Sequence, residues 1–295
     1  MMKNNFLIIV SIFMGILLGS CSSDDGPATA PVEINILNLE ALEGSLQYKA
    51  WLKVDGNDIA IGTFQDVNFP KSFTALSDDL TSATEFFITI EGVGSSDNPS
   101  DSKIASATFS GTSNTAQISS SQTLGDFTGI TGSFVLRTFT GDTPTEDANG
   151  VWFTSSLSGS ATNAVAGLSL PIPGSGWEYE GWVVLEDRDG SDVEVSIGKF
   201  SDINEGDSSD IFSGNGTAPS LPGEDFLNEA AGNLINVEIP ANLVGKEVYI
   251  TLQPTSSSIT SEPFYITLLS VSSAIENGEN TMNSNNFFIT GTVER

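Results

Sequence analysis

The sequence contains no histidine and only one cysteine among its 295 residues. Without histidine, the chain cannot build a Ser-His-Asp triad, a Cys-His pair or a His-ligated zinc site. One cysteine allows neither an internal disulfide nor a cysteine-ligated metal cluster. The chemistry that stays open is carboxylate catalysis, binding of a hard cation, or binding without catalysis.

Positive charge is also scarce. Ten Lys and Arg residues stand against 38 Asp and Glu residues, which gives a formal net charge of −28. So few basic residues cannot form the positive surface that nucleic acids require, and this excludes a nucleic acid partner. The same negative charge favours solubility.

Residues 1–20 have the pattern of a secretory signal peptide. Lys3 is the only charged residue before an apolar run, and this run is shorter than the roughly 20 residues of a transmembrane helix. The residues that follow it resemble a bacterial lipobox: Leu18, Gly19, Ser20 and Cys21. Cleavage before Cys21 and acylation of its thiol would attach the chain to a membrane through N-terminal acyl chains.

Residues 21–31 follow as a predicted flexible tether, because they are rich in Ser, Asp, Gly, Pro and Ala and lack apolar periodicity. Asp24 and Asp25 resemble the export tag of surface lipoproteins in the Bacteroidetes group. This resemblance implies an outer-membrane lipoprotein that faces the cell exterior. The periplasmic face is the alternative.

The rest of the chain contains an internal repeat, which predicts two units. Two segments repeat closely and two more correspond loosely: 48–54 with 179–185, 61–67 with 197–203, 86–91 with 248–253, and 134–138 with 287–291. The predicted units cover residues 32–145 and 150–295.

Both units have the sequence features of β-strands. Alternating apolar residues, frequent turn residues and the hairpin dipeptides Asp55-Gly56 and Asp189-Gly190 occur throughout, and no helical period persists. The sequence therefore predicts an all-β fold of two tandem antiparallel β-sandwich domains. Trp51 and Trp182 recur at the same strand position, and we expect both to be buried.

The repeated motif resembles a known family. It reads Tyr-x-x-Trp-(Leu/Val)-x-Val, an Asp-Gly turn, then Ile-Gly-x-Phe. Its residues are Tyr48, Trp51, Asp55, Gly56, Ile61, Gly62 and Phe64, and again Tyr179, Trp182, Asp189, Gly190, Ile197, Gly198 and Phe200, with Leu185 in place of Val. The motif is similar to the C-terminal extracytoplasmic domain of anti-sigma-K factors, here in a tandem lipoprotein form of Bacteroidetes type. This resemblance implies a sandwich fold and a sensing or docking role. It does not imply sigma-factor binding, because the sigma-binding helical domain and the transmembrane helix have no counterpart in this sequence.

Two places in the second unit are candidate binding sites. Asp187, Asp189 and Asp192 could offer oxygen atoms to Ca²⁺, although their spacing is not that of an EF-hand and a solvated hairpin turn is the alternative. No other cofactor is expected. Trp177 directly precedes a predicted strand and is a candidate for an exposed ligand contact.

Further acidic residues gather in segments 204–210 and 223–225, which we predict to be solvated loops. Two carboxyl groups roughly 5–10 Å apart can catalyse glycoside hydrolysis. No motif selects one such pair among the 38 acidic residues.

These observations predict a surface- or periplasm-anchored lipoprotein whose tandem domains act as a binding, sensing or scaffold module, without catalysis. Its partner would be a protein or a glycan. One alternative is an extracellular carbohydrate-binding or adhesion lipoprotein. Another is a two-carboxylate hydrolase.

Overall fold

The computed structural model describes residues 26–42, 44–95, 97–141, 148–155, 161–255, 262–285 and 287–295. The predicted signal peptide, Cys21 and residues 22–25 of the tether lie outside this part of the chain. The described residues form β-strands with only short helices, and this confirms the all-β prediction. Within them, no helix has the length and apolar character needed to cross a membrane.

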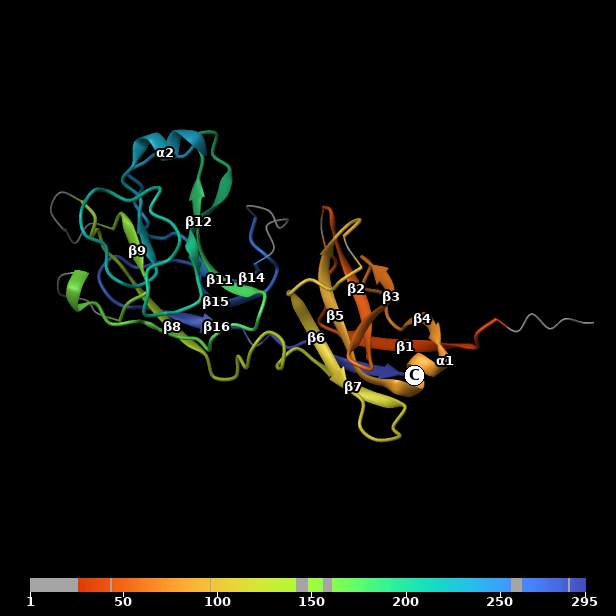
Figure 1. Cartoon of the computed structure of the whole chain (residues 1–295). Helices are drawn as coiled ribbons and strands as arrows, with labels where there is room; N and C mark the ends of the chain where they lie inside the picture. Colours follow the sequence, from red (N-terminus) through yellow and green to blue (C-terminus); the bar gives the residue numbers. More distant parts are fainter. Residues whose placement is uncertain are drawn as a thin grey trace, which may run out of the picture.

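The first of two large antiparallel sheets contains eight strands (Figure 1). They are β1 (Thr29–Leu37), β2 (Leu46–Val54), β3 (Asn57–Phe64), β4 (Lys71–Leu76), β5 (Ala83–Gly92), β6 (Lys103–Thr108), β7 (Thr115–Ser119) and β17 (Thr290–Glu294). Their order in the sheet is β3-β2-β5-β6-β7-β17-β1-β4. The short helix α1 (Ser77–Ser82) follows β4. We call this sheet and its loops the first unit.

The second sheet contains the remaining strands. They are β8 (Thr131–Leu136), β9 (Gly150–Trp152), β10 (Leu168–Ser169), β11 (Trp177–Glu186), β12 (Asp192–Phe200), β13 (Gly223–Asp225), β14 (Val248–Pro254), β15 (Thr267–Val271) and β16 (Asn280–Ser284). Their order is β12-β11-β14-β15-β16-β8-β9-β13, and β10 pairs with β8. A short 3₁₀-helix (Ala161–Asn163) and α2 (Glu229–Leu234) lie in its loops. We call this sheet and its loops the second unit.

Each sheet curls so that its two edge strands come together. In the first unit β3 contacts β4, and in the second β12 contacts β13. Gly62 of β3 lies against the ring of Phe73 in β4, where no Cβ atom would fit. The curled sheets therefore enclose their apolar side chains.

The pairing registers confirm the close repeats. Tyr48 lies opposite Phe64 and Ile90, and Tyr179 lies opposite Phe200 and Leu252. These pairs also confirm the loose correspondence of residues 86–91 with 248–253. The two units therefore have the same strand pairing, and these residues occupy equivalent positions in it.

A bulge precedes each repeated tryptophan, between Ala50 and Trp51 and between Gly181 and Trp182. The extra residue lies on the partner strand, β3 or β12, so the alternation along β2 and β11 is unbroken. Each tryptophan points to the opposite face from Tyr48 or Tyr179, and its ring therefore lies outside the main apolar cluster. Both rings are still fully buried, as expected. Trp51 Nε1 donates to Thr89 Oγ1 at 2.8 Å, and Trp182 Nε1 donates to Thr251 Oγ1 at 2.9 Å.

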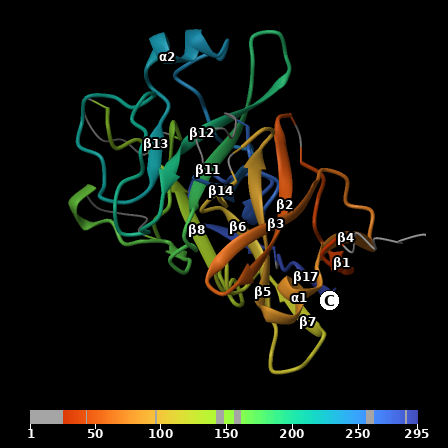
Figure 2. The same cartoon turned by 45° about the vertical axis from the view of Figure 1, so that its right-hand side comes forward.

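The predicted unit boundaries do not match the two sheets. Strand β8 falls in the predicted first unit but pairs with β9, β10 and β16 of the second. Strand β17 falls in the predicted second unit but pairs with β1 and β7 of the first, as Figure 2 shows. The two strands hold the same sixth position in the two sheets. The units have therefore exchanged their last strands.

The loose correspondence of residues 134–138 with 287–291 is wrong. Gly132 lies opposite Met282 of β16, and Gly291 lies opposite Ile118 of β7, the equivalent strand. Residues 131–133 (Thr-Gly-Ser) therefore correspond to residues 290–292 (Thr-Gly-Thr). A Cβ atom at either glycine would collide with its neighbours, so the glycine, and not the nearby phenylalanines, marks the shared position.

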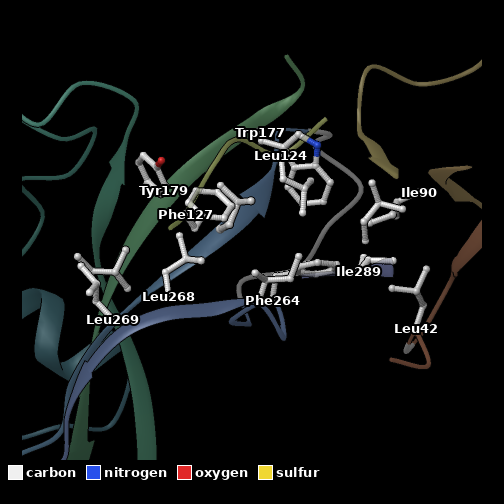
Figure 3. Close-up of a cluster of buried hydrophobic side chains, with 14 of the residues drawn as sticks. Leu42, Ile90, Leu124, Phe127, Trp177, Tyr179, Phe264, Leu268, Leu269 and Ile289 are labelled. Carbon is white, nitrogen blue, oxygen red and sulfur yellow. The ribbon is translucent and has the colours of Figure 1, made fainter. Parts of the chain in front are cut away.

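A buried apolar cluster joins the two units. The segments that cross between the sheets, 120–130 and 285–289, contribute Leu124, Phe127 and Ile289, each about 1% exposed. Figure 3 shows Leu124 beside Trp177 of the second unit, Phe127 beside Tyr179, and Ile289 on the side of Ile90 and Leu42 of the first unit. The apolar core is therefore continuous across the junction.

Candidate functional site

A cavity of about 400 Å³ opens at the junction of the two units. This volume lies within the range of small-molecule binding sites. Both units line it: Lys53, Asp58, Phe87, Pro99, Ser100, Asp101, Lys103, Gln122 and Thr123 from the first, and Gly174 and Ser175 from the second. A ligand in this cavity would touch both halves of the molecule.

Two lysines converge at this cavity over one aromatic ring. Lys103 Nζ lies 3.9 Å and Lys53 Nζ 6.0 Å from the centre of the Phe87 ring, which is a cation–π geometry. Lys53 pairs with Asp58 at 2.7 Å, and Lys103 pairs with Glu85 at 2.9 Å. Each ammonium has three N–H groups, so these ion pairs leave donors for a ligand.

This use of lysine is unusual for the chain. Only nine Lys and Arg residues follow the predicted signal peptide, and two of them line one cavity. Asp58 and Asp101 line the same cavity, so its charges balance. Such a site offers many hydrogen-bond donors and acceptors without a strong net field.

The second unit is fitted closely against the first beside the cavity. The Gly174 amide donates to the Leu124 carbonyl oxygen at 3.0 Å. A Cβ atom on Gly174 would collide with the carbonyl of Thr123. Ser102 Oγ donates to the carbonyl oxygen of Gly176 at 3.1 Å. The wall of the cavity is therefore held by direct contacts between the units.

Trp177 belongs to this contact and is not an exposed ligand platform. It is only 3% exposed, and its Nε1 donates to the Lys103 carbonyl oxygen at 3.0 Å. Its ring packs against Phe264. The prediction of an exposed ligand contact at Trp177 is wrong, because the first unit covers the strand end that carries it. Trp177 instead positions the strand that carries Lys103.

The structure does not gather the three carboxyl groups of the acidic hairpin into a metal-binding cluster. Asp187 Oδ1 accepts hydrogen bonds from the amides of Asp189 and Ser191, at 2.9 and 2.8 Å. Asp189 accepts one from Asn236 Nδ2 at 3.0 Å. Among the described residues, no three acidic or cysteine side chains group closely enough to hold a metal ion. Asp187, Asp189 and Asp192 therefore do not converge, because Asp187 is used to close the turn.

Two other carboxyl groups are buried, and a third is half-buried, where we predicted solvated loops. Glu224 and Asp225 are fully buried in β13, and Asp207 lies in the long loop that covers this strand. The prediction is wrong for these residues because β13 pairs with β9 and is covered by residues 201–222. Glu205 and Asp210 are exposed, as expected.

Asp207 and Glu224 share Ser209 as a partner. The Ser209 amide donates to Asp207 Oδ1 at 2.8 Å, and its hydroxyl donates to Glu224 Oε2 at 3.1 Å. The Ser213 hydroxyl donates to the other oxygen of Glu224. Burial raises the pKa of Asp207 to about 6 and that of Glu224 to about 7. Both carboxyl groups can therefore change protonation near neutral pH.

Within the second unit, Asp225 of β13 links the chain after β8 to Trp152 of β9. Its Oδ2 accepts from the amides of Phe139 and Thr140, at 2.8 and 2.5 Å, and from Thr140 Oγ1 at 2.7 Å. Its Oδ1 accepts from Trp152 Nε1 at 2.7 Å. All four donors point at the carboxylate, so Asp225 stabilises the fold around it.

A smaller cavity of about 280 Å³ lies beside these acids and is lined by Asp207, Ser209, Asp210 and Ser213, among others. Glu224 does not line it and has both oxygens engaged by serine hydroxyls. The pair has the raised pKa values of an acid–base site, but only Asp207 of the two lines the cavity. A third cavity, of about 450 Å³, lies at the C-terminus, where Arg295 donates to the carbonyls of Leu80 and Ala83.

Few local motifs indicate these sites. The junction cavity depends on which segments of the two units meet, and no local motif encodes that. The short run Gly223–Asp225 resembles a turn, although Leu221 and Phe226 beside it are apolar. Those flanking residues were the available signal of burial.

The chain was compared with protein-family models, curated proteins and solved structures, and none of them matches it.

Proposed function

We propose that the protein is a lipid-anchored extracytoplasmic binding protein that captures its ligand in the cavity between the two units and does not catalyse a reaction. The observation that carries this proposal is the convergence of Lys53 and Lys103 at a cavity that both units line. The anchor belongs to the proposal through the lipobox that ends at Cys21. Two parts of the proposal rest on sequence motifs alone. They are display on the exterior of the outer membrane and similarity to the anti-sigma-K extracytoplasmic domain.

The lining of the cavity favours a hydroxyl-rich ligand such as the end of a glycan. Lys53, Lys103 and Gln122 supply donors, Asp58 and Asp101 supply acceptors, and the balanced charges attract no ion strongly. Phe87 and Pro99 add apolar surface. Small-ligand sites usually combine apolar surface with a few specifically positioned polar groups.

Binding can be tested on an array of neutral and acidic glycans. We expect the wild-type protein to bind a set of glycans. The affinity of Lys103→Gln for these glycans should be at least tenfold lower. Lys199→Gln is the matched control, because Lys199 pairs with Glu178 at the same 2.9 Å but lines none of the three cavities. Equal binding by both variants, or no glycan bound by the wild type, would refute this ligand assignment.

The anchor has a separate test. In cells, Cys21→Ala is expected to move the protein from the membrane fraction to the soluble fraction, because no thiol remains to be acylated. Ser22→Ala serves as the control and should stay with the membranes. If Cys21→Ala protein stays in the membrane fraction, the lipobox assignment is wrong.

Hydrolysis is a second candidate, favoured by the raised pKa values of Asp207 and Glu224 beside one cavity. An acid–base role would require Glu224 to become accessible to a substrate. Release of reducing sugar from the same glycans, abolished by Glu224→Gln, would support it.

A further inference from the structure

The first observation is the identical strand order of the two sheets. Position by position, β3-β2-β5-β6-β7 corresponds to β12-β11-β14-β15-β16, and β1-β4 corresponds to β9-β13. The sixth position is filled by β17 in the first unit and by β8 in the second. In each case the strand comes from the other repeat.

The second observation is that the two strands fit their positions in the same register. Gly291 and Gly132 lie opposite the equivalent residues Ile118 and Met282. The residues two places further on, Val293 and Phe134, are both completely buried. Each sheet therefore has an acceptor position for an extended segment with glycine at one fixed point and an apolar residue two places later.

The third observation is that the connection from β16 to β17 does not have to cross. Ser284 at the end of β16 and Thr290 at the start of β17 are separated by five residues, which is an ordinary hairpin length. A hairpin would place β17 next to β16. The chain instead sends β17 to the first unit, where it lies between β7 and β1.

We infer that each unit carries a strand-acceptor site whose ligand is the final strand of the other unit, and that this exchange holds the two halves together independently of the covalent link between them. The only direct chain between β8 and β9 runs through residues 137–149, and both strands lie in the second unit. A cut there leaves an N-terminal fragment with one strand in the second sheet, and a C-terminal fragment with one strand in the first. The second unit thus stays attached after cleavage, because separation requires a central strand to leave each sheet.

The inference can be tested with the mature full chain carrying Cys21→Ser and a protease site between residues 141 and 148. Asn35 of β1 lies opposite Thr292 of β17, and neighbouring antiparallel strands bring Cα atoms within disulfide range. A double variant with Asn35→Cys and Thr292→Cys is oxidised after folding. It is then cleaved and run on a denaturing gel without reductant. One band at the intact mass is expected, because the disulfide joins the two fragments.

The matched control is Asn35→Cys with Ser133→Cys, since Ser133 is the β8 residue equivalent to Thr292. This pair should form no disulfide in the exchanged chain, and cleavage should give two separate fragments. A disulfide in the control pair, together with two fragments from the test pair, would show that each unit keeps its own strand. Disulfide-linked products of twice the mass would show that a second copy supplies β17. Either result overturns the inference, and so does separation of the two fragments on size-exclusion chromatography when the chain is cleaved without the added cysteines.

Discussion

Trp177 Nε1 donates to the carbonyl oxygen of Lys103 across the junction, at 3.0 Å. The bond joins the first residue of β11 to the first residue of β6. The backbone of a residue that lines the cavity is therefore fixed by a side chain from the other unit.

Trp177→Phe should therefore weaken both stability and binding. It removes the N–H group and leaves the Lys103 carbonyl without this donor, at an expected cost of about 1–2 kcal/mol in unfolding free energy. Urea denaturation and glycan binding measure the two effects. Trp182→Phe is the control, because it loses an indole hydrogen bond to Thr251 far from the cavity. It should lose stability but keep its affinity.

Stability should rise as the pH falls from 8 to about 5.5. The pKa values of Asp207 and Glu224 are raised in the folded protein, to about 6 and about 7. A carboxyl group whose pKa is higher in the folded than in the unfolded protein contributes stability at pH values below its unfolded pKa. This contribution is lost as the pH rises through its folded pKa. We expect Glu224→Gln to be less dependent on pH in thermal denaturation, and Glu276→Gln, at an exposed site, to behave as the wild type. A wild-type melting temperature that is lower at pH 5.5 than at pH 8 would contradict this expectation.

Asp225→Asn should destabilise the protein at every pH in that range. Four donors point at the Asp225 carboxylate, and an amide nitrogen would face at least one of them. The expected loss is about 2–3 kcal/mol, measured by urea denaturation. Asp210→Asn, in the exposed part of the covering loop, should change the unfolding free energy by less than about 0.5 kcal/mol. Equal effects of the two variants would remove the structural role given to Asp225.

Removing calcium should leave the melting temperature unchanged. Asp187 already accepts two amide hydrogen bonds within its own turn, so no cation is needed to neutralise the hairpin. EDTA added to calcium-equilibrated protein measures this directly. A drop of several degrees would indicate a bound ion.

The strand repeat could be predicted from sequence because its signals are local. The Tyr-x-x-Trp segment, the hairpin turn and the following strand lie close together, and their pairing follows from the turn itself. The position of Trp51 outside the main apolar cluster follows from simple alternation, because Tyr48 and Leu52 face the core and Trp51 has the opposite parity.

The exchange and the buried acids could not be predicted in this way. Thr290–Glu294 would fit either sheet by composition, and the choice depends on contacts with β1 and β7, more than 150 residues away in the chain. Asp207 and Glu224 look solvated until the covering loop supplies Ser209 and Ser213 as donors. Such long-range partners are set by the tertiary fold.

The crossing of β17 also decides how the molecule would respond to a pulling force. Strand β1 leads from the tether at Thr29, and β17 leads from the second unit at Thr290. The two strands are antiparallel, with Leu37 opposite Thr290 and Glu33 opposite Glu294, so a pull between tether and second unit loads them from opposite ends. Their hydrogen bonds, perpendicular to the strands, would then be sheared together and not peeled one at a time. Because the segment 120–130 crosses as well, the load divides between two connections, and neither sheet has to unravel strand by strand before the other bears force.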